Sequence, residues 1–329
     1  MGVRDNDLTK IRKFRGLNNR AEEPLADMGV LRDAQNVDIT INNRVRTRVG
    51  SSDVLVPCTL GHSLWTDHEG MLPFGLYADS DELRTLNPDM TNELVRNALS
   101  IGLDISYTRV NDSVYWSNGV ESGMVDSMAE SHPWWCEQPA GQPDLAAVPG
   151  SLGAGQVQVA VTFQDRLGRE SGATLAAAID IGPGEGLELS NIPQPSDPVQ
   201  TPKIVVYVTS GNDRALYRAK VVPAGATMTQ VLQPPDGRII ATQFLSPMPS
   251  GHIVRRWNGR LLVARDRHLI RSEALRYGLT HVGHNDIGFR NRLTLMEPIE
   301  GDGAGVYVSD GTRILFLTGD DPAAWVPKP

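Results

Sequence analysis

The chain repeats one local unit, in which an alternating strand is followed by a short polar turn and a second strand. Period-two alternation bounded by turn residues is the strongest short-range signal for a β-hairpin. Four segments show it, 74–87, 105–119, 252–273 and 304–321, with turns at Asp79–Asp81, Asn111–Asp112, Asn258–Gly259, Arg265–Arg267 and Ser309–Gly311. Because these hairpins recur on both sides of the chain's middle, the sequence predicts an all-β fold.

Composition supports many short strands rather than long helices. The 329 residues include 32 Gly and 22 Pro, and 40% of them are hydrophobic, which is enough for a packed core. Repeated β-meanders of this kind are typical of propeller blades, each of which spans roughly 40 to 50 residues. We therefore predict a divergent β-propeller of about four to six blades, and an irregular sandwich or barrel is the alternative.

A different module lies between the two groups of hairpins. It follows a Pro- and Gly-rich segment, 137–155, which we interpret as a linker that proteases should cleave first. After it come about seven short alternating strands within roughly 90 residues, the size and rhythm of an immunoglobulin or fibronectin-III sandwich. The Cys-Trp-Cys core of antibody domains is absent, so the sequence favours a fibronectin-like module inserted into the propeller.

These patterns predict four regions. Residues 1–35 form an N-terminal arm with one short helix at Val30–Asn36, and 36–145 form the first part of the propeller. Residues 150–245 form the inserted immunoglobulin- or fibronectin-III-like domain, and 246–329 form the second part of the propeller. No window approaches the ~18 to 20 apolar residues of a membrane span, so none is expected.

Signs of catalysis or metal binding are weak. The chain contains no nucleophile elbow, Walker loop, dinucleotide-binding fingerprint or HExxH helix, so we do not expect an enzyme or a cofactor. His281 and His284 lie close in sequence to Asp286, but no further pair completes a set of metal ligands. Cys58 and Cys136 have no metal or disulfide spacing, which favours a reduced setting.

Two groups of arginines are the candidate interaction residues. The segment 36–50 predicts a hairpin that turns at Asn42–Asn43, and one face of its second strand carries a comb of arginines. The second group lies between 255 and 271. The candidate interface residues are Arg44, Arg46, Arg48, Arg255, Arg256, Arg260, Arg265 and Arg267.

Charge is distributed unevenly along the chain. Residues 51–200 contain 5 basic and 21 acidic residues, whereas both flanks are mildly basic and the whole chain has a net charge of −8. A free DNA-binding domain would be basic overall. The arginine groups therefore face an acidic neighbouring copy, DNA, or only water.

Several longer stretches resemble virion structural proteins of tailed bacteriophages. They are "FRGLNNRAEEPLADMGVLRDAQNVDITINNRVRTRVGSS", "ISYTRVNDSVYWSNGVESG", "VAVTFQDRLGRESGAT", "VVYVTSGNDRALYRAKVVPAG" and "MPSGHIVRRWNGRLLVARD". In that group the fold is a β-propeller, sometimes with an immunoglobulin-like insertion. Its members build the tail nozzle or hub of short-tailed phages.

The resemblance implies a structural role in the virion tail for a protein made in the cytoplasm of the bacterial host. The expected partners are copies of the chain itself in a hexameric ring around the DNA path, other phage tail or adaptor proteins, and, transiently, genomic DNA during ejection. A ring places the arginines against a neighbour's acidic segment, because a strongly basic lumen would retain DNA. The alternative is a host-surface adhesion or receptor-binding module of the tail or baseplate.

Overall fold

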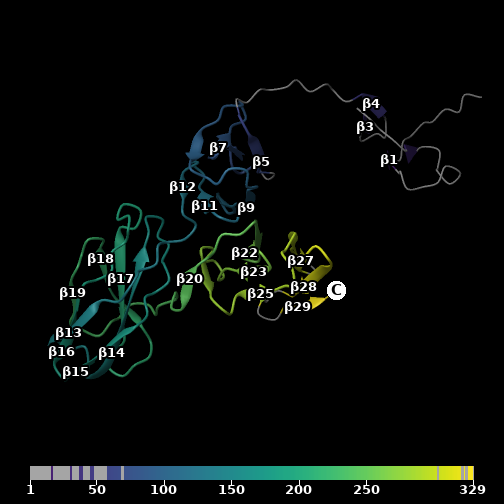
Figure 1. Cartoon of the computed structure of the whole chain (residues 1–329). Helices are drawn as coiled ribbons and strands as arrows, with labels where there is room; N and C mark the ends of the chain where they lie inside the picture. Colours follow the sequence, from purple (N-terminus) through teal and green to yellow (C-terminus); the bar gives the residue numbers. More distant parts are fainter. Residues whose placement is uncertain are drawn as a thin grey trace, which may run out of the picture. The chain divides into compact units, whose positions relative to one another are not determined.

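The computed structural model describes residues 58–67, 70–301, 304–319, 322 and 325–328, with strand backbone also at 16–17, 30–31, 37–39 and 45–47. The chain divides into two units, Met1–Leu55 and Val56–Pro329. Within the described residues every named element is a β-strand, which confirms the predicted all-β class (Figure 1). Accordingly, this described part contains no helix that is long and apolar enough to cross a membrane.

The first unit contains two short strand pairs. Strands β1 (Gly16–Leu17) and β2 (Val30–Leu31) pair in parallel. Because Val30 and Leu31 belong to a strand, the helix predicted at Val30–Asn36 is wrong at its first two residues. Strands β3 (Val37–Ile39) and β4 (Val45–Thr47) are antiparallel, as the alternation predicts, and Asp38 stands opposite Arg46. Arg44, Arg48 and the side chain of Arg46 lie outside the described residues, so the orientation of the comb stays a prediction.

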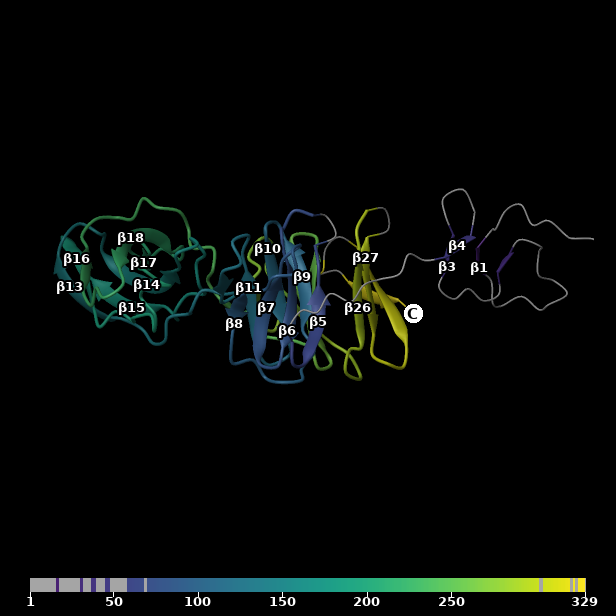
Figure 2. The same ribbon diagram turned by 90° about the horizontal axis from the view of Figure 1, so that it is seen from above.

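Four sheets of the second unit share one topology, in which four antiparallel strands are paired in sequence order. The first sheet contains β5 (Gly61–Trp65), β6 (Gly75–Asp79), β7 (Glu82–Leu86) and β8 (Leu94–Arg96), and the second contains β9 (Ser106–Val110), β10 (Ser113–Ser117), β11 (Ser122–Val125) and β12 (Ser131–His132). The third contains β21 (Ile253–Trp257), β22 (Arg260–Arg265), β23 (His268–Arg271) and β25 (Asp286–Gly288), and the fourth contains β26 (Leu295–Ile299), β27 (Gly305–Ser309), β28 (Ile314–Thr318) and β29 (Val326–Lys328). In Figure 2, β5 to β8 lie side by side within the first sheet, and β26 lies beside β27 within the fourth.

The turns within these sheets occur where the sequence predicts them. Asn111 joins β9 to β10 with φ 55°, and Asp266 joins β22 to β23 with φ 52°. Asn258 and Gly259 join β21 to β22, and both have positive φ, 43° and 67°. Asn, Asp and Gly tolerate this left-handed conformation, which two-residue hairpin turns require.

Seven strands form a separate two-sheet module between the second and third sheets of the chain. One of its sheets contains β13 (Asp144–Pro149), β16 (Glu185–Ser190) and β19 (Thr229–Val231), and the other contains β15 (Ala177–Ile181), β14 (Gly155–Gln164), β17 (Lys203–Val208) and β18 (Tyr217–Pro223). Side chains of both sheets share one buried core, which includes Val159, Phe163, Leu187 and Ile204. Six of these strands, β14 to β19, begin at residue 155 or later, where the sequence predicts about seven.

The predicted linker is wrong over part of its length. Strand β13 lies within 137–155 and pairs with β16 from Asp144 to Pro149. The seven-strand module therefore begins before residue 150. A further pair, β20 (Leu245–Pro247) and β24 (Leu279–His281), connects the end of this region to the loop that precedes β25.

The four-stranded sheets pack on one another in sequence order. One apolar cluster joins the first sheet to the second and includes Leu76, Leu83, Val114 and Trp116. A second joins the second sheet to the third through Tyr115, Met124, Val254 and Val263, and a third joins the third sheet to the fourth through Trp257, Leu262, Val306 and Leu317. We call this series of four sheets the stack.

Hydrogen bonds align the first strands of successive sheets. The backbone N–H of Val254 donates to Ser106 Oγ and that of Arg256 donates to Thr108 Oγ1, both at 3.0 Å. Between the first two sheets, the N–H of Ile105 donates to Ser63 Oγ at 2.9 Å. The first strand of each sheet therefore lies beside the first strand of the next.

Candidate functional site

The turn between β11 and β12 creates the main cluster of ionisable side chains. Asp126 follows β11, and its Oδ1 accepts the backbone N–H groups of Met128 at 3.0 Å and Glu130 at 2.9 Å. Aspartate commonly closes turns in this way because its short side chain reaches the backbone two to four residues ahead. The turn brings β12 back alongside β11, so that His132 approaches Asp126.

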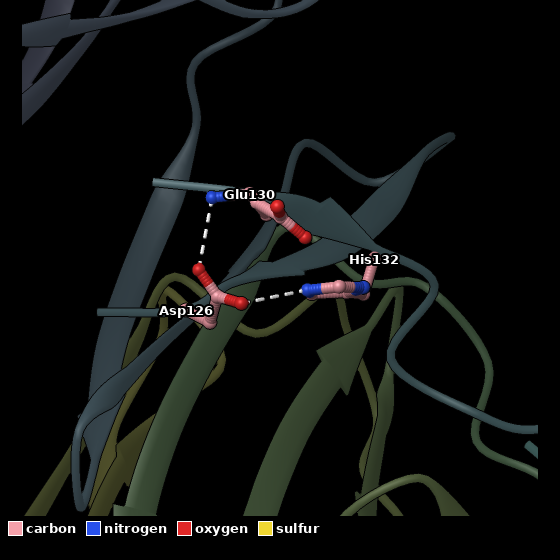
Figure 3. A group of neighbouring side chains, drawn as sticks. All are labelled: Asp126, Glu130 and His132. Carbon is pink, nitrogen blue, oxygen red and sulfur yellow. Dashed lines mark hydrogen bonds and ion pairs between the residues drawn. The ribbon is translucent and has the colours of Figure 1, made fainter. Parts of the chain in front are cut away.

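Asp126, Glu130 and His132 form a compact group (Figure 3). Their ligand-type atoms lie within 4.8 Å of one another, the only such group of three or more in the described part of the chain. His132 Nε2 is 2.9 Å from Asp126 Oδ2, and the imidazole is buried, with 2% of its side chain exposed. One imidazole and two carboxylates are a donor set that divalent metals use.

An arginine from the seven-strand module fills the remaining side of this group. Arg166 follows β14, and its Nη2 lies 3.0 Å from Glu130 Oε2 and 3.2 Å from His132 Nδ1. Because a guanidinium only donates, Nδ1 must accept, and Nε2 therefore carries the proton that is donated to Asp126. We call Asp126, Glu130, His132 and Arg166 the His132 junction.

The same loop makes a second contact with the stack. Asp165 Oδ1 accepts the N–H groups of Leu167 and Arg169, and its Oδ2 accepts from Arg169 Nε at 2.7 Å. This fixes the side chain of Arg169, whose Nη2 donates to the carbonyl of Pro133 at 2.9 Å. Two arginines from one tight loop thus bind the strand end that carries His132.

The electrostatics of the His132 junction favour the ionised form of Asp126. Burial opposes ionisation of Asp126, but the hydrogen bonds from His132 and from the N–H groups of Glu130 and Met128 outweigh it and lower its pKa. Both imidazole nitrogens already have partners, and Arg166 occupies the position of a cation. A divalent metal would have to displace that guanidinium, so the arrangement serves best to hold the seven-strand module against the second sheet.

The structure pairs three of the predicted interface arginines within the chain. Arg255 Nε lies 3.1 Å from Glu297 Oε2, and Arg256 Nη2 lies 3.8 Å from Glu300 Oε1, so both connect the third sheet to the fourth. Arg260 donates to the carbonyl of Ser272 at 3.0 Å. The remaining two, Arg265 and Arg267, are exposed at the turn between β22 and β23.

The histidines that the sequence singled out do not gather with a carboxylate. The rings of His281 and His284 meet edge to face, with centroids 4.3 Å apart. Asp286 instead contacts His268, with 2.9 Å between Nδ1 and Oδ1. The segment from His281 to Asp286 is therefore held by one contact between rings and one contact between an imidazole and a carboxylate.

Sequence reasoning missed His132, the most buried side chain of the cluster. Its partner Arg166 lies 34 residues further along the chain, in another module, so no local spacing connects them. The only local signal is Asp126, placed where a turn could bring the end of the next strand back to it.

Comparisons with known proteins identify no family for this chain. A scan against protein-family models finds no match to this chain, and a search of curated proteins finds none either.

Proposed function

We propose that the protein is a structural component of a phage tail, as a nozzle, hub or tip, and that it assembles into a homo-oligomeric ring. Its four-stranded sheets are blades of a divergent β-propeller, and the seven-strand module is a fibronectin-III-like insertion. The sequence resemblance and the repeated meander topology support this architecture. The observation that supports assembly is the exposed face of the fourth sheet, at which the stack ends.

Each sheet of the stack covers one face of the next, and the last sheet presents an apolar face outward. The register of β26, β27 and β28 places one set of side chains on a single face of the fourth sheet. The opposite face packs on the third sheet through Val306, Val308 and Leu317. The outward set also contains Glu297, Ser309 and Thr318; its apolar members, which we call the end face, are Leu295, Ile299, Tyr307, Ile314 and Phe316.

The end face exposes large apolar side chains to solvent. The exposed fractions are 42% for Leu295, 39% for Tyr307 and 62% for Ile314. Tyr307 and Phe316 lie with ring centroids 4.5 Å apart, so the apolar side chains are contiguous across neighbouring strands. Contiguous apolar surface rimmed by polar groups is typical of protein–protein interfaces.

We infer that a neighbouring copy of the chain covers the end face, in the way that each sheet of the stack covers the next. Inside the chain, each such face is covered by the next four-stranded sheet, and another copy supplies the same type of surface. Contacts between different surfaces of identical subunits are head-to-tail, and they close into rings when the rotation allows. Host-surface adhesion is the second candidate, and it is favoured by a cavity of about 350 Å³ between the seven-strand module and the stack.

Mass measurement of the full chain tests the assembly. Native mass spectrometry and light scattering should show one oligomer, and electron micrographs should show closed rings. The variant Tyr307→Ser/Ile314→Asn should be monomeric, because it makes the end face polar. Its matched control, Leu175→Asn, changes an even more exposed apolar residue of the seven-strand module (78% exposed) and should assemble normally.

Two results would contradict this proposal. A wild-type chain that remains monomeric at high concentration would remove the ring, and an antibody that fails to label the tail of the encoding phage would remove the location. Unchanged assembly of the end-face variant would show that copies meet elsewhere. The hairpin arginines, Arg44, Arg46 and Arg48, would then be the next surface to alter.

A further inference from the structure

A groove of about 740 Å³ lies on the seven-strand module, at the face of the β14 sheet that points away from the module core. Val157 and Val159 of β14 belong to that core, so the alternation of the strand places Gln158, between them, on the outer face. The segment before β13, the segment between β14 and β15, and the segment that leads into β20 form the other walls. We call it the glutamine groove, and its volume is typical of ligand pockets, roughly 300 to 1,000 Å³.

Phe244 lines the glutamine groove on an unfavourable backbone. The N–H of Leu245 donates to the carbonyl of Thr242 at 3.2 Å, which closes a four-residue turn, and Phe244 takes the third position of that turn with φ 64°. Glycine or asparagine is usual at such a position, because a bulky side chain is strained there. Phe244 is also 68% exposed. It therefore favours neither the turn nor the core, and strain of this kind is typical of a binding residue.

The turn that carries Phe244 is held in place by close packing. The backbone of Gly172 approaches the carbonyl of Leu245 so closely that a Cβ at residue 172 would collide with it. Ala173 and Ile240, from the two neighbouring segments, belong to one buried apolar cluster on the outer face of the β14 sheet. The groove is therefore formed before any ligand arrives, which lowers the entropic cost of binding.

Amide side chains supply most of the polar groups. They are Gln138, Gln142, Gln158 and Gln243, and none of the described residues that line the groove is charged. Gln138 and Gln142 donate from Nε2 to backbone carbonyls of the segment between β14 and β15, at 3.0 and 3.2 Å, and each retains Oε1 as an acceptor. The side chains of Gln158 and Gln243 are partly exposed and make no hydrogen bond to another described residue.

This combination matches an uncharged ligand that is rich in hydroxyl groups. An amide both donates and accepts, as a hydroxyl does, whereas a carboxylate or phosphate would find no cation in the groove. The exposed ring of Phe244 offers an apolar surface to the C–H face of a sugar ring. A protein partner would instead require an apolar contact area with a polar rim, and here one aromatic ring lies among amides.

We propose that the glutamine groove binds a neutral oligosaccharide, whose hydroxyls exchange hydrogen bonds with the glutamine amides while one sugar ring rests on Phe244. This goes beyond the structural role proposed above. The site is also independent of ring assembly, because none of its residues belongs to the end face, so either proposal can fail without the other.

Titration of the full chain with defined trisaccharides tests the site. Maltotriose, mannotriose and chitotriose are the neutral probes, and trigalacturonate is the acidic one. Binding is followed by calorimetry and by saturation-transfer NMR, which detects contact between sugar C–H protons and the protein. At least one neutral probe should bind saturably, and trigalacturonate should bind at least about tenfold more weakly, since its carboxylates would lose water without gaining a cation.

The variant Phe244→Gly removes the ring and relaxes the turn at once. It should raise the thermal unfolding midpoint, because glycine tolerates positive φ, and weaken binding of the preferred probe at least about tenfold. The matched control is Leu275→Gly, which changes another exposed bulky residue with positive φ (75% exposed, φ 58°) that lies outside the groove. It should raise the midpoint similarly and leave binding unchanged.

The variant Gln158→Leu tests the amides. It keeps the length of the side chain but removes its hydrogen-bonding groups, so binding should weaken about tenfold, as loss of one hydrogen bond predicts. Its control, Gln233→Leu, changes an exposed glutamine outside the groove and should bind normally. Binding of no neutral probe, tighter binding of trigalacturonate, or unchanged binding by Phe244→Gly would each overturn the proposal. Unchanged or tighter binding by Gln158→Leu would overturn it too, because it would indicate an apolar occupant such as a protein segment.

Discussion

The seven-strand module and the stack bury their apolar side chains in different ways. The module encloses one core between its own two sheets. The stack has no such core, because each of its clusters lies between two successive sheets. A module with an internal core is complete by itself, whereas a stack is stabilised by neighbours and ends on a face that still needs one. Assembly is therefore expected through the stack.

The contact between the two regions differs from both interiors. It includes the polar His132 junction and the second arginine contact at Pro133. Polar contacts of this kind contribute less than an apolar core, so we predict that the module and the stack unfold separately.

The largest expected effect comes from removing one core aromatic in each region. Phe163→Ala should destabilise the module, and Trp257→Ala should destabilise the stack, each by roughly 3–5 kcal/mol, the usual cost of such a cavity. Both side chains are fully buried, and Trp257 also contacts Trp325 at 4.9 Å between centroids. Hydrogen exchange should show lost protection in 155–231 for the first variant and in 253–318 for the second.

Shared losses would contradict the comparison. If either variant lowered protection equally in both regions, they would unfold as one cooperative unit. The His132 junction would then be a rigid part of a single core rather than a polar contact between two.

The sequence predicts the hairpins of the stack well and the edge strand β13 of the module poorly. Turns at Asn111, Asn258 and Asp266 are visible because few residue types tolerate positive φ, and the adjoining strands alternate. Strand β13 was missed because it is mostly exposed and contains Asp, Ala and Pro, which have low strand propensity. Its backbone pairing with β16 holds it in place, and pairing between distant segments leaves no local pattern.

Charged residues were the least predictable part of the candidate site. The sequence marks Arg255 and Arg256 as candidate interface residues. Their carboxylate partners, however, lie more than forty residues further along the chain, at the neighbouring sheet. His132 shows the same limit, because Arg166 reaches it from another module. Local spacing identifies ion pairs within one element, but these pairs depend on how separate elements pack.

A smaller effect is expected at the contact between the regions. Asp126→Asn removes the ionised carboxylate that accepts from His132 and from the backbone turn, and should lower stability by roughly 1–3 kcal/mol at pH 7. The pKa of Asp126 is lowered in the folded protein, so its contribution is complete above the unfolded value of about 4 and is lost as the pH falls further. The deficit of the variant should therefore shrink in acid.

Urea unfolding at several pH values between 3 and 7 measures this deficit. Asp112→Asn, an exposed aspartate in the turn of the same sheet, is the matched control and should follow the wild type throughout. A deficit of the Asp126 variant that is the same at every pH would show that the ionised carboxylate contributes nothing, and that only the shape of the turn matters.

The smallest effects separate a satisfied hydroxyl inside the module from an unsatisfied one in the segment between β19 and β20. Thr162 Oγ1 donates to Glu170 at 2.6 Å, so Thr162→Val should cost about 1 kcal/mol, a typical net value for one hydrogen bond. Thr242 Oγ1 has no partner among the described residues, so Thr242→Val should stabilise the ligand-free protein by about 0.5–1 kcal/mol, since it removes an unpaired buried group. Thermal unfolding in ligand-free buffer distinguishes the two signs. If Thr242→Val instead destabilises the protein as Thr162→Val does, the Thr242 hydroxyl already has a water partner and is as fully satisfied as that of Thr162.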